Sequence, residues 1–543
     1  MNSNSTLTLP DNISVYCYLE KYAKQYGKDT AISFYGKKIT YEQLLSRIDT
    51  AAKALIAYGV KKDDVVAASL PGMPEGIYLI YAINKIGAIY CAFDCRAKNE
   101  EIKETLHTFA PKLCIVPNFQ VKEFHDIHDC PVVYISPVHT LGGIEKLYSI
   151  PTDFFTGRDF VRLRNPNIMK YDRFIKGGNS IDTYPVERSS QDIFGYFYTS
   201  GTTYGRKSVI LTNQNINASV AIHRIANQEI QPGQVLLNIM PLFTCYSVTL
   251  AVHLPLTSGV SVTLIPLVDT KKLKQTLLKE KPNYIITVPS HWEFFIHESF
   301  KGCDLSFMKK IIIGGDTIKP AYRKTLNSIF RIHGSCEPVL VGYGLTETTS
   351  SATAAFAGPE NSVGRALPYM QLAICDPESG KFLPTGEEGE ICIHGPTVCS
   401  GYFQDEAATQ QLLRLHDDGK VWLHSGDRGY MDDTGVVYFC ERYKRMYVRF
   451  DGTKISPYSI EQGITGCPLV ENVLVVAFAD GAHSHGMCAK AYVVLKKGEN
   501  KETAPGAIMR YCKKHLDEHM QPHEIVIVDS LPHTKNGKLR YFE

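Results

Sequence analysis

A hydroxyl-rich turn follows an aromatic strand near the middle of the chain, within the segment GYFYTSGTTYGRKSV (195–209). Five consecutive small residues and a nearby lysine could act together here: Thr199, Ser200, Gly201, Thr202, Thr203 and Lys207. Such a turn can direct backbone N–H groups and hydroxyls at phosphate oxygens, and the lysine adds positive charge. Ser, Thr and Gly also dominate ordinary polar loops, so composition alone leaves both interpretations open.

The same segment comes close to the phosphate-binding loop of P-loop enzymes, which reads G-x-x-x-x-G-K-[ST]. From Gly201 the chain reads GTTYGRKS, so Arg206 stands where the second glycine is required. A P-loop phosphotransferase is therefore a rival hypothesis.

A second candidate segment, GYGLTET (342–348), follows an apolar run. Tyr343 offers a flat face for a base, Thr346 a hydroxyl for a phosphate, and Glu347 a hard oxygen ligand for Mg²⁺. Open α/β sheets bind ligands where their strands end, which is where this segment is expected. Each residue taken singly is also typical of a helix cap or a solvated side chain.

Two further segments carry one candidate residue each. In LHSGDRGYMDDTG (423–435), Asp427 lies in a tight Ser-Gly-Asp turn and could accept hydrogen bonds from two ribose hydroxyls. It could equally be an ordinary Asx-turn residue. In LPHTKNGKLRY (531–541), Lys538 follows Asn-Gly, and by composition alone it would be a surface lysine.

Alternating helix-like and strand-like patterns position these segments. Helices are expected over 41–57, 74–86 and about 504–519. Strands are expected over 65–70, 88–93, 284–289, 309–315, 338–344, 473–479, 489–495 and 525–529. The alternation predicts parallel sheets with helical crossovers. Short strands with turns over 372–396 predict a β-rich subdomain, the last hundred residues a separate small unit, and 151–191 a long surface connection.

Composition excludes several classes of protein. Of the 543 residues, 44% are hydrophobic and 21% charged, as in globular proteins, and the net charge of +2 favours neither a nucleic-acid nor a membrane partner. The fifteen cysteines form no CxxC pair and no secretory leader precedes them, so we expect a cytoplasmic protein with reduced thiols. Residues 235–268 carry no charged side chain, but three prolines divide them, which indicates buried α/β core rather than a membrane span.

The ordered set of segments resembles the acyl-adenylate-forming superfamily: acyl- and aryl-CoA synthetases, nonribosomal peptide adenylation domains and beetle luciferase. The similar segments are YTSGTT (198–203), GYGLTE (342–347), SGD (425–427), RYK (442–444) and GK (537–538). Weaker similarity lies in ITYEQL (39–44), GGD (314–316), SVGRALP (362–368) and GEEGEICIHGP (386–396). The resemblance covers the chain from about Ile39 to its end.

The resemblance implies an α/β fold. A large N-terminal AMP-binding domain (1–443) would contain two doubly wound halves and the β-rich subdomain, and a small mobile α+β domain (444–543) would follow. It implies a two-step reaction in which a carboxylic acid and ATP give acyl-AMP and pyrophosphate, and a thiol then takes the acyl group. The thiol would belong to coenzyme A or to the phosphopantetheine of a carrier protein, and Mg²⁺ would assist.

By the same resemblance, the turn Thr199 to Thr203 and Lys207 would hold the leaving phosphates. Thr346 would contact the α-phosphate, and Glu347 would help to hold Mg²⁺. Lys538 would bridge the attacking carboxylate and the α-phosphate. The attack of one anion on another is opposed by charge, so positioning and neutralisation are what catalysis requires.

The resemblance also assigns the remaining nucleotide and domain residues. Tyr343 and Gly315 would line the adenine, and Gly344 would belong to the same nucleotide site. Asp427 would bind the ribose with help from Arg442. Lys444 would be the hinge, and the loop around Gly452 would admit the thiol arm once the small domain swings, a gating step.

The chain departs from the family pattern at several positions. The phosphate loop usually continues G-x-P-K-G, whereas this chain has Tyr204, Gly205, Arg206, Lys207 and Ser208. Glu441 replaces the usual glycine before the hinge motif, and the interval to Gly452 is one residue longer. The charged residues are retained, which favours an active enzyme over a non-catalytic nucleotide-binding module.

The acid is constrained by one segment, PLFTCYS (241–247). Domains that activate amino acids place an aspartate near here to pair with the ammonium group, and a buried ammonium without a partner is costly. We therefore expect an aryl, alkyl or fatty acid, with Cys245, His291 and Trp292 as pocket candidates. The alternative is a stand-alone amino-acid adenylation enzyme that serves a separate carrier protein.

Overall fold

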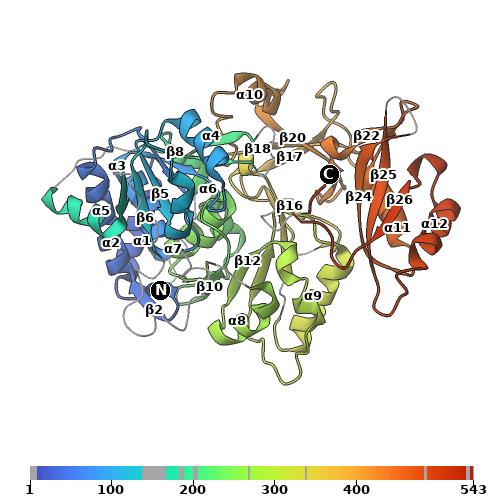
Figure 1. The fold of residues 1–543 in the computed structure, drawn as a ribbon, viewed down its shortest axis with the longest axis horizontal. Coiled ribbons are helices and arrows are strands. Elements are labelled where there is room, and N and C mark those ends of the chain that lie inside the picture. Colours follow the sequence, from blue (N-terminus) through green and yellow to red (C-terminus); the bar gives the residue numbers. More distant parts are fainter. Residues whose placement is uncertain are drawn as a thin grey trace.

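The computed structural model describes residues 9–10, 12–136, 167–182, 189–199, 206–266, 269–336, 339–356, 358–481, 486–533 and 539–541. Two large sheets with their helices lie next to each other, the β-rich subdomain lies above the second sheet in this view, and the small C-terminal domain stands at the far end (Figure 1). The predicted fold class is confirmed.

The first sheet has seven strands in the order β7-β6-β5-β3-β4-β8-β9. Its strands are β3 (Val65–Ala68), β4 (Ile89–Ala92), β5 (Leu113–Pro117), β6 (Val132–Ile135), β7 (Ile168–Lys170), β8 (Ile193–Tyr198) and β9 (Ser208–Thr212). All neighbours are parallel except β8 and β9, which form an antiparallel pair on either side of residues 199–207. The helices of this part are α1 (Val15–Tyr26), α2 (Tyr41–Ala57), α3 (Pro74–Ile86), α4 (Asn99–Phe109), α5 (Tyr171–Gly177) and α6 (Asn213–Ala226).

The second sheet has nine strands in the order β16-β15-β14-β13-β12-β10-β11-β1-β2. They are β1 (Thr30–Phe34), β2 (Lys37–Thr40), β10 (Val235–Asn238), β11 (Ser261–Leu264), β12 (Tyr284–Thr287), β13 (Lys310–Ile313), β14 (Val339–Tyr343), β15 (Thr353–Ala354) and β16 (Arg365–Ala366). The six strands from β14 to β1 are parallel, and their continuous apolar runs are typical of strands covered on both faces. Its helices are α7 (Leu254–Thr257), α8 (Leu273–Glu280) and α9 (Pro320–Ile332).

Local chemistry explains why two predicted helices are confirmed at both ends. The Thr40 hydroxyl oxygen accepts the backbone N–H of Gln43, and Gln43 Oε1 accepts the backbone N–H of Thr40, so a capping box starts α2. Pro74 occupies the first position of α3, and Gly87 ends it in the left-handed conformation with φ 102°.

The expected surface connection over 151–191 is wrong for residues 168–182. There β7 adds a parallel strand to the first sheet, and α5 packs on α2. Phe174 of α5 is fully buried, with its ring centroid 5.2 Å from that of Tyr58. A few apolar side chains within a polar segment were enough to bring it into the core.

The described part of the uncharged segment, residues 235–266, is mostly buried, as predicted for 235–268. It contains β10, a π-helical turn (Ser247–His253), α7 and β11. In the described part of the chain, no helix combines the length and the apolar character that crossing a bilayer requires.

The β-rich subdomain is an antiparallel sheet in the order β17-β18-β20-β19, with β21 also paired to β20. Its elements are β17 (Gln371–Cys375), β18 (Gly389–His394), β19 (Leu413–Leu415), β20 (Val421–Met431), β21 (Val437–Arg442) and α10 (Glu406–Leu412). The long strand β20 carries the Ser-Gly-Asp segment in its middle.

The small domain has its own elements: β22 (Tyr447–Val448), β23 (Lys454–Ile455), α11 (Pro457–Thr465), β24 (Val470–Ala479), β25 (Met487–Leu495), α12 (Ala504–His515) and β26 (Glu524–Ile527). The helix expected to reach His519 ends at His515, because Leu516 becomes extended and packs on the core of this domain. All buried members of that core lie at or after Tyr447.

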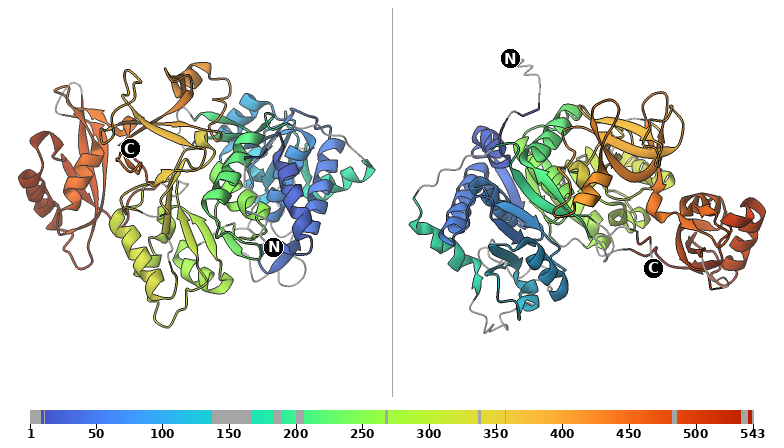
Figure 2. Two further views of the ribbon diagram at one scale, coloured as in Figure 1. Left: turned by 180° about the vertical axis from the view of Figure 1, so that it is seen from behind. Right: turned by 90° about the horizontal axis from the view of Figure 1, so that it is seen from above.

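Polar contacts join the small domain to the large one. Lys319 Nζ donates to the carbonyl of Val473 at 3.4 Å, and the backbone N–H of Tyr458 donates to Glu441 Oε2 at 3.3 Å. The C-terminal end of the chain lies at this junction in each view (Figure 2).

Candidate active site

The predicted adenine-lining residues and Gly344 lie at the carboxyl edge of the second sheet. Gly315 follows β13 closely, Tyr343 ends β14, and Gly344 comes next; β13 and β14 are parallel neighbours. A Cβ added to Gly344 would lie 2.5 Å from the Cα of Ser351, so only glycine fits where the chain leaves β14. The structure therefore brings these three residues together at the edge where α/β sheets bind ligands.

Asp427 is buried between Tyr343 and Arg442. The Tyr343 hydroxyl donates to Asp427 Oδ2 at 2.8 Å, and Arg442 Nε lies 3.2 Å from Oδ1. The ion pair follows from the register, because Asp427 of β20 lies opposite Arg442 of β21. Burial raises the pKa of Asp427 to about 6, although Arg442 and the Tyr343 hydroxyl act to lower it. Although Oδ1 lies in the ion pair with Arg442, it accepts no hydrogen bond from the described residues, which leaves an acceptor for a ligand hydroxyl.

Two residues outside the predicted site hold the turn that presents Asp427. Glu390 Oε1 accepts the N–H of Gly426 at 2.7 Å, and Glu390 Oε2 lies 2.8 Å from His424 Nδ1. Burial disfavours the Glu390 carboxylate, but bonds from His424 and Gly426 outweigh it and lower its pKa. Glu390 lies in the segment 386–396, which has weak similarity to the family, so the sequence indicated an acidic residue here. Its pairing with His424 could not be read in this way, because it depends on strand register.

Cys392 joins Glu390 and His424, and the donor atoms of the three lie within 4.8 Å of one another, as in a metal site. However, His424 Nε2 lies 2.9 Å from Nε2 of His416, so both ring nitrogens already face partners. Cys392 Sγ also lies within hydrogen-bond distance of His424 Nδ1, at 3.6 Å. The cluster is best described as a hydrogen-bonded network.

Tyr402 connects two predicted site residues. Its hydroxyl donates to Glu347 Oε1 at 2.7 Å, and Lys207 Nζ lies 4.7 Å from the centre of its ring. Glu347 lies on a 3-10 turn (Thr346–Thr348) that follows β14. Tyr402 was not among the residues predicted from the sequence, because it lies between two segments of recognised similarity. The three residues place the carboxylate expected to bind Mg²⁺ near the lysine expected to bind phosphate.

Only the two ends of the predicted phosphate loop are described. The Thr199 N–H donates to the Lys207 carbonyl at 2.9 Å, and the Lys207 N–H lies 3.3 Å from Thr199 Oγ1. Ser200, Gly201, Thr202, Thr203 and Tyr204 lie outside the described residues. Arg206 pairs with Glu101 of α4 at 3.3 Å, and Ser208 Oγ is buried without a hydrogen-bond partner among the described residues.

Lys538 also lies outside the described residues, but the chain on either side of it contacts the large domain. His533 Nε2 lies 3.1 Å from Glu293 Oε1, and the N–H of Leu539 donates to Asp316 Oδ2 at 2.6 Å. The hydrogen bond to Glu293 raises the pKa of His533. The segment 534–538 is therefore bracketed by two contacts with the large domain.

The predicted hinge and thiol-arm residues lie at the start of the small domain. Lys444 is exposed in a 3-10 turn (Tyr443–Arg445), and Gly452, with φ 84°, lies in the turn between β22 and β23. Their roles stay predictions, as does the domain boundary at Lys444.

The three acid-pocket candidates occupy different surroundings. The buried Cys245 thiol donates to the carbonyl of Thr349 at 3.1 Å, and burial raises its pKa to about 12. Burial lowers the pKa of His291 to about 4, and its buried Nδ1 has no hydrogen-bond partner in the described part of the chain. Trp292 lies fully buried in an apolar core cluster, and its indole N–H donates to Thr287 Oγ1 at 2.9 Å.

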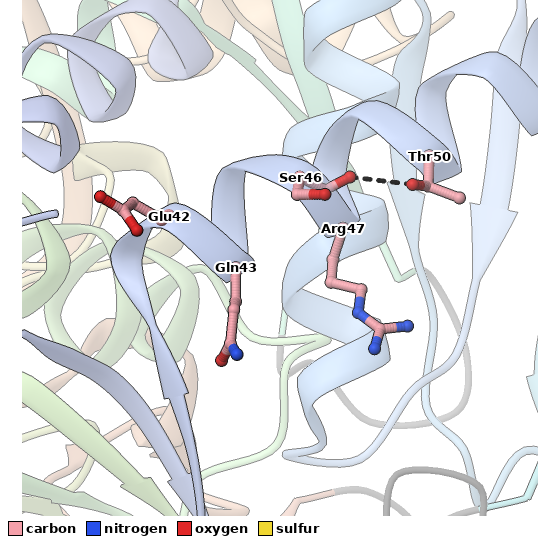
Figure 3. Close-up of a pocket in the computed structure, with 5 residues that line it drawn as sticks. All are labelled: Glu42, Gln43, Ser46, Arg47 and Thr50. Atoms are coloured by element: carbon pink, nitrogen blue, oxygen red, sulfur yellow. Dashed lines mark hydrogen bonds between the residues drawn. The ribbon is translucent and has the colours of Figure 1, made fainter. Parts of the chain in front are cut away.

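A hollow on the outer surface of α2 contains none of the predicted site residues (Figure 3). It is lined by Glu42, Gln43, Ser46, Arg47 and Thr50. Two of these side chains make hydrogen bonds within the same region, since Gln43 closes the capping box and Thr50 Oγ1 donates to the carbonyl of Ser46 at 2.9 Å. The hollow is formed by side chains on one face of α2, away from the predicted site residues.

Known proteins resemble the chain over nearly its whole length. The long-chain-fatty-acid–CoA ligase of Bacillus subtilis (strain 168) is 26% identical, over 98% of this chain and 94% of that protein. The 2-succinylbenzoate–CoA ligase of Bacillus mycoides (strain KBAB4) is 28% identical over 94% of each. The ATP-bound structure of MatB from Rhodopseudomonas palustris superposes with a TM-score of 0.81, at 22% identity and 97% coverage of both chains, and shows the same fold.

Two family descriptions match successive parts of the chain. Residues 19–403 match the AMP-binding enzyme family, and residues 459–538 match the AMP-binding enzyme C-terminal domain. The predicted superfamily and the predicted class, AMP-forming acid–thiol ligases, are confirmed by these matches and by the relatives. The chain that gathers Tyr343, Asp427 and Glu347 around the end of β14 thus belongs to the AMP-binding enzyme family.

Proposed function

We propose that this protein joins a small carboxylic acid to coenzyme A in two steps. The acid carboxylate first attacks the α-phosphorus of ATP, the bond to the β-phosphate breaks, and acyl-AMP and pyrophosphate form. The thiol of coenzyme A then attacks the acyl carbonyl, the bond to AMP breaks, and a thioester forms. The CoA ligases among the relatives support this choice of acceptor over a carrier protein.

One observation carries the proposal: the buried Tyr343–Asp427 pair at the end of β14, with the exposed Arg442 beside it. Asp427 accepts the ribose hydroxyls through the oxygen that has no hydrogen-bond partner among the described residues, and Tyr343 lies against the adenine with Gly315, while Gly344 belongs to the same nucleotide site. A buried carboxylate favours a ligand that supplies hydrogen-bond donors, because a buried polar group without a hydrogen bond costs free energy.

The first step requires neutralisation of negative charge. Lys207 and the turn Thr199, Ser200, Gly201, Thr202 and Thr203 hold the leaving β- and γ-phosphates, and Thr346 contacts the α-phosphate. Lys538 bridges the attacking carboxylate and the α-phosphate. These groups act by position and charge, which is the dominant contribution in phosphoryl transfer.

Glu347 fits a magnesium ion, because a carboxylate is a hard oxygen donor and the Tyr402 hydroxyl orients it. When bound, Mg²⁺ neutralises charge on the phosphate oxygens. The contribution of this chain is to fix the Glu347 carboxylate through Tyr402, whose ring also faces the Lys207 ammonium.

The second step requires the small domain to move about Lys444, so that the turn at Gly452 reaches the site and admits the pantetheine arm. The self-contained core of the small domain supports such a movement. A cytoplasmic location agrees with the fifteen free cysteines, eleven of them buried, because disulfides are rare in the cytoplasm.

The acid is aryl, alkyl or fatty. The segment 241–247 has no aspartate for an ammonium group, and the relatives named above act on fatty and aryl-containing acids. Cys245 and His291 are the pocket residues we retain. Trp292 is less suited, because its ring is surrounded by the apolar core.

The test is carboxylate-dependent exchange of pyrophosphate into ATP across a panel containing palmitate, 4-coumarate, 2-succinylbenzoate, benzoate and several α-amino acids. We expect exchange with one of the non-amino acids, and coenzyme A should then give a thioester. Exchange with an amino acid, and acyl transfer only to a carrier protein, would support the stand-alone adenylation alternative. Nucleotide binding without exchange for any acid would support a non-catalytic module.

Lys538→Ala separates catalysis from binding. We expect this variant to lose most of the exchange activity while it binds ATP as the wild type does, since the lysine acts on the reacting groups. Unchanged exchange in Lys538→Ala would refute the role of this residue.

A further inference from the structure

Asp316 binds the C-terminal tail at two points. Its Oδ2 accepts the N–H of Leu539 at 2.6 Å, and its Oδ1 accepts the hydroxyl of Tyr541 at 2.9 Å. A third bond, from the N–H of Thr317 at 2.8 Å, holds the carboxylate itself in place. Two of the three donors therefore come from residues more than 220 positions away in the sequence.

Asp316 lies next to the predicted nucleotide site. It directly follows Gly315, beyond the end of β13, and β13 is the parallel neighbour of the strand that ends in Tyr343. The tail is thus bound at the same sheet edge as the residues assigned to the adenine. No role was assigned to Asp316 in the sequence analysis.

The tail is also anchored to the small domain. Leu539 and Tyr541 pack against an apolar cluster that contains Leu474 and Val476 of β24. The guanidinium carbon of Arg445, next to the hinge, lies 4.2 Å from the centre of the Tyr541 ring. The tail end therefore joins the small domain and hinge region to one carboxylate of the large domain.

We propose that Asp316 is a positioning residue for acyl-AMP formation, and this inference rests on the proposed function. By fixing the backbone N–H of Leu539, it restricts the chain at the residue directly after Lys538, because consecutive Cα atoms are only about 3.8 Å apart. It touches none of the reacting groups itself. The second step, which follows the movement of the small domain, does not use these bonds.

A carboxylate is suited to this task because it accepts hydrogen bonds in several directions and donates none. An asparagine at position 316 has a single acceptor oxygen: if its N–H₂ faces Leu539 that tail bond is lost, and if it faces Tyr541 and Thr317 the bond from the Thr317 N–H is lost. In either orientation the remaining bonds are no longer made to a charged group. Hydrogen bonds to charged groups are the stronger class, and the loss of one is expected to slow acyl-AMP formation by about tenfold or more.

The experiment compares Asp316→Asn and Tyr541→Phe with the wild type in three assays. Pyrophosphate exchange with the best acid of the panel measures the first step. Thioester formation from the purified acyl-AMP of that acid and coenzyme A measures the second step. Titration with AMP measures the nucleotide site. We expect the first rate to fall about tenfold in Asp316→Asn and less in Tyr541→Phe, while the other two measurements stay within about twofold.

Asp304→Asn is the matched control, because this exposed carboxylate caps the N–H of Ser306 and its change also removes one charge. Equal loss in both steps of Asp316→Asn, or an unchanged first step, would overturn the proposal. A tenfold loss in Asp304→Asn would show a general charge effect and would overturn it too.

Hydrogen–deuterium exchange keeps this inference separate from the proposed function. The peptide that contains Leu539 should be protected in the wild type and should exchange faster in Asp316→Asn, whether or not an acid is known. Equal exchange in both proteins would overturn the contact. If the contact is confirmed but no acid supports pyrophosphate exchange in the wild type, the proposed function fails, and with it the positioning role.

Discussion

Replacing Tyr343 by phenylalanine should change the pH at which the protein binds a nucleoside. The Tyr343 hydroxyl donates to Asp427 at 2.8 Å and so favours the ionised carboxylate, while burial holds the pKa of Asp427 at about 6. Burial also raises the pKa of Tyr343 itself, so the hydroxyl stays a donor over the whole range tested. The variant keeps the ring and removes only this donor.

The size of the effect follows from two constants. A hydrogen bond to a charged group contributes about 1.5–3 kcal/mol, and one pKa unit corresponds to about 1.4 kcal/mol. The pKa of Asp427 should therefore rise by roughly one to two units in Tyr343→Phe, to roughly 7–8. At pH 7 the ionised fraction would fall from about nine-tenths to between about a half and a tenth, so binding weakens about two- to tenfold.

Adenosine is the appropriate ligand, because it has ribose hydroxyls but no phosphate that titrates in this range. Its dissociation constant, measured by calorimetry between pH 5 and pH 9, should rise about tenfold per pH unit below about pH 6 in the wild type. In Tyr343→Phe the same rise should begin at roughly pH 7–8, and the two proteins should agree at pH 9. For 2′,3′-dideoxyadenosine, neither protein should show this dependence.

Two outcomes would refute this reasoning. An identical midpoint in both proteins would mean that the hydroxyl does not control Asp427. A uniform loss of affinity at every pH would mean that the hydroxyl contacts the nucleoside directly or supports the fold. Asp427→Asn is the control, and its profile should be flat because the titrating group is absent.

Two further substitutions test the surroundings of the site. Tyr402→Phe removes the donor to Glu347 and should lower pyrophosphate exchange about fivefold, with a raised requirement for Mg²⁺; titration of the exchange rate with MgCl₂ measures this, and an unchanged requirement contradicts it. Trp292→Ala should lower the free energy of unfolding by about 3–5 kcal/mol, because it empties a fully buried position; urea unfolding measures it, and a stable variant with an altered acid preference would instead support a place for Trp292 in the acid pocket.

Local signals made much of the fold predictable. Thr40 and Gln43 fixed the start of one helix, Pro74 and Gly87 both ends of another, and apolar runs marked the central strands. The sequence composition misled at 168–182, where a few apolar side chains, among them Phe174, were sufficient to add a strand and a helix.

Contacts between distant segments account for what the sequence could not indicate. Asp316 meets Leu539 across 223 positions, and the bond from Tyr402 to Glu347 spans 55. The partnership of Glu390 with His424 depends on the register of two antiparallel strands. Each residue type was visible, but only the folded chain brings the partners together.

The separate core of the small domain has a consequence for the domain movement that we propose. Because the members of this apolar cluster all lie at or after Tyr447, the proposed rotation would leave the cluster intact, and the bonds that break would include those of Lys319, Glu441 and Asp316. Water can take the place of each hydrogen-bond partner that is lost. The two domains could therefore separate and rejoin repeatedly without exposing an apolar patch that favours aggregation. Dissolved salt screens the charged contacts between the two domains, so a higher ionic strength would shorten the lifetime of the closed arrangement.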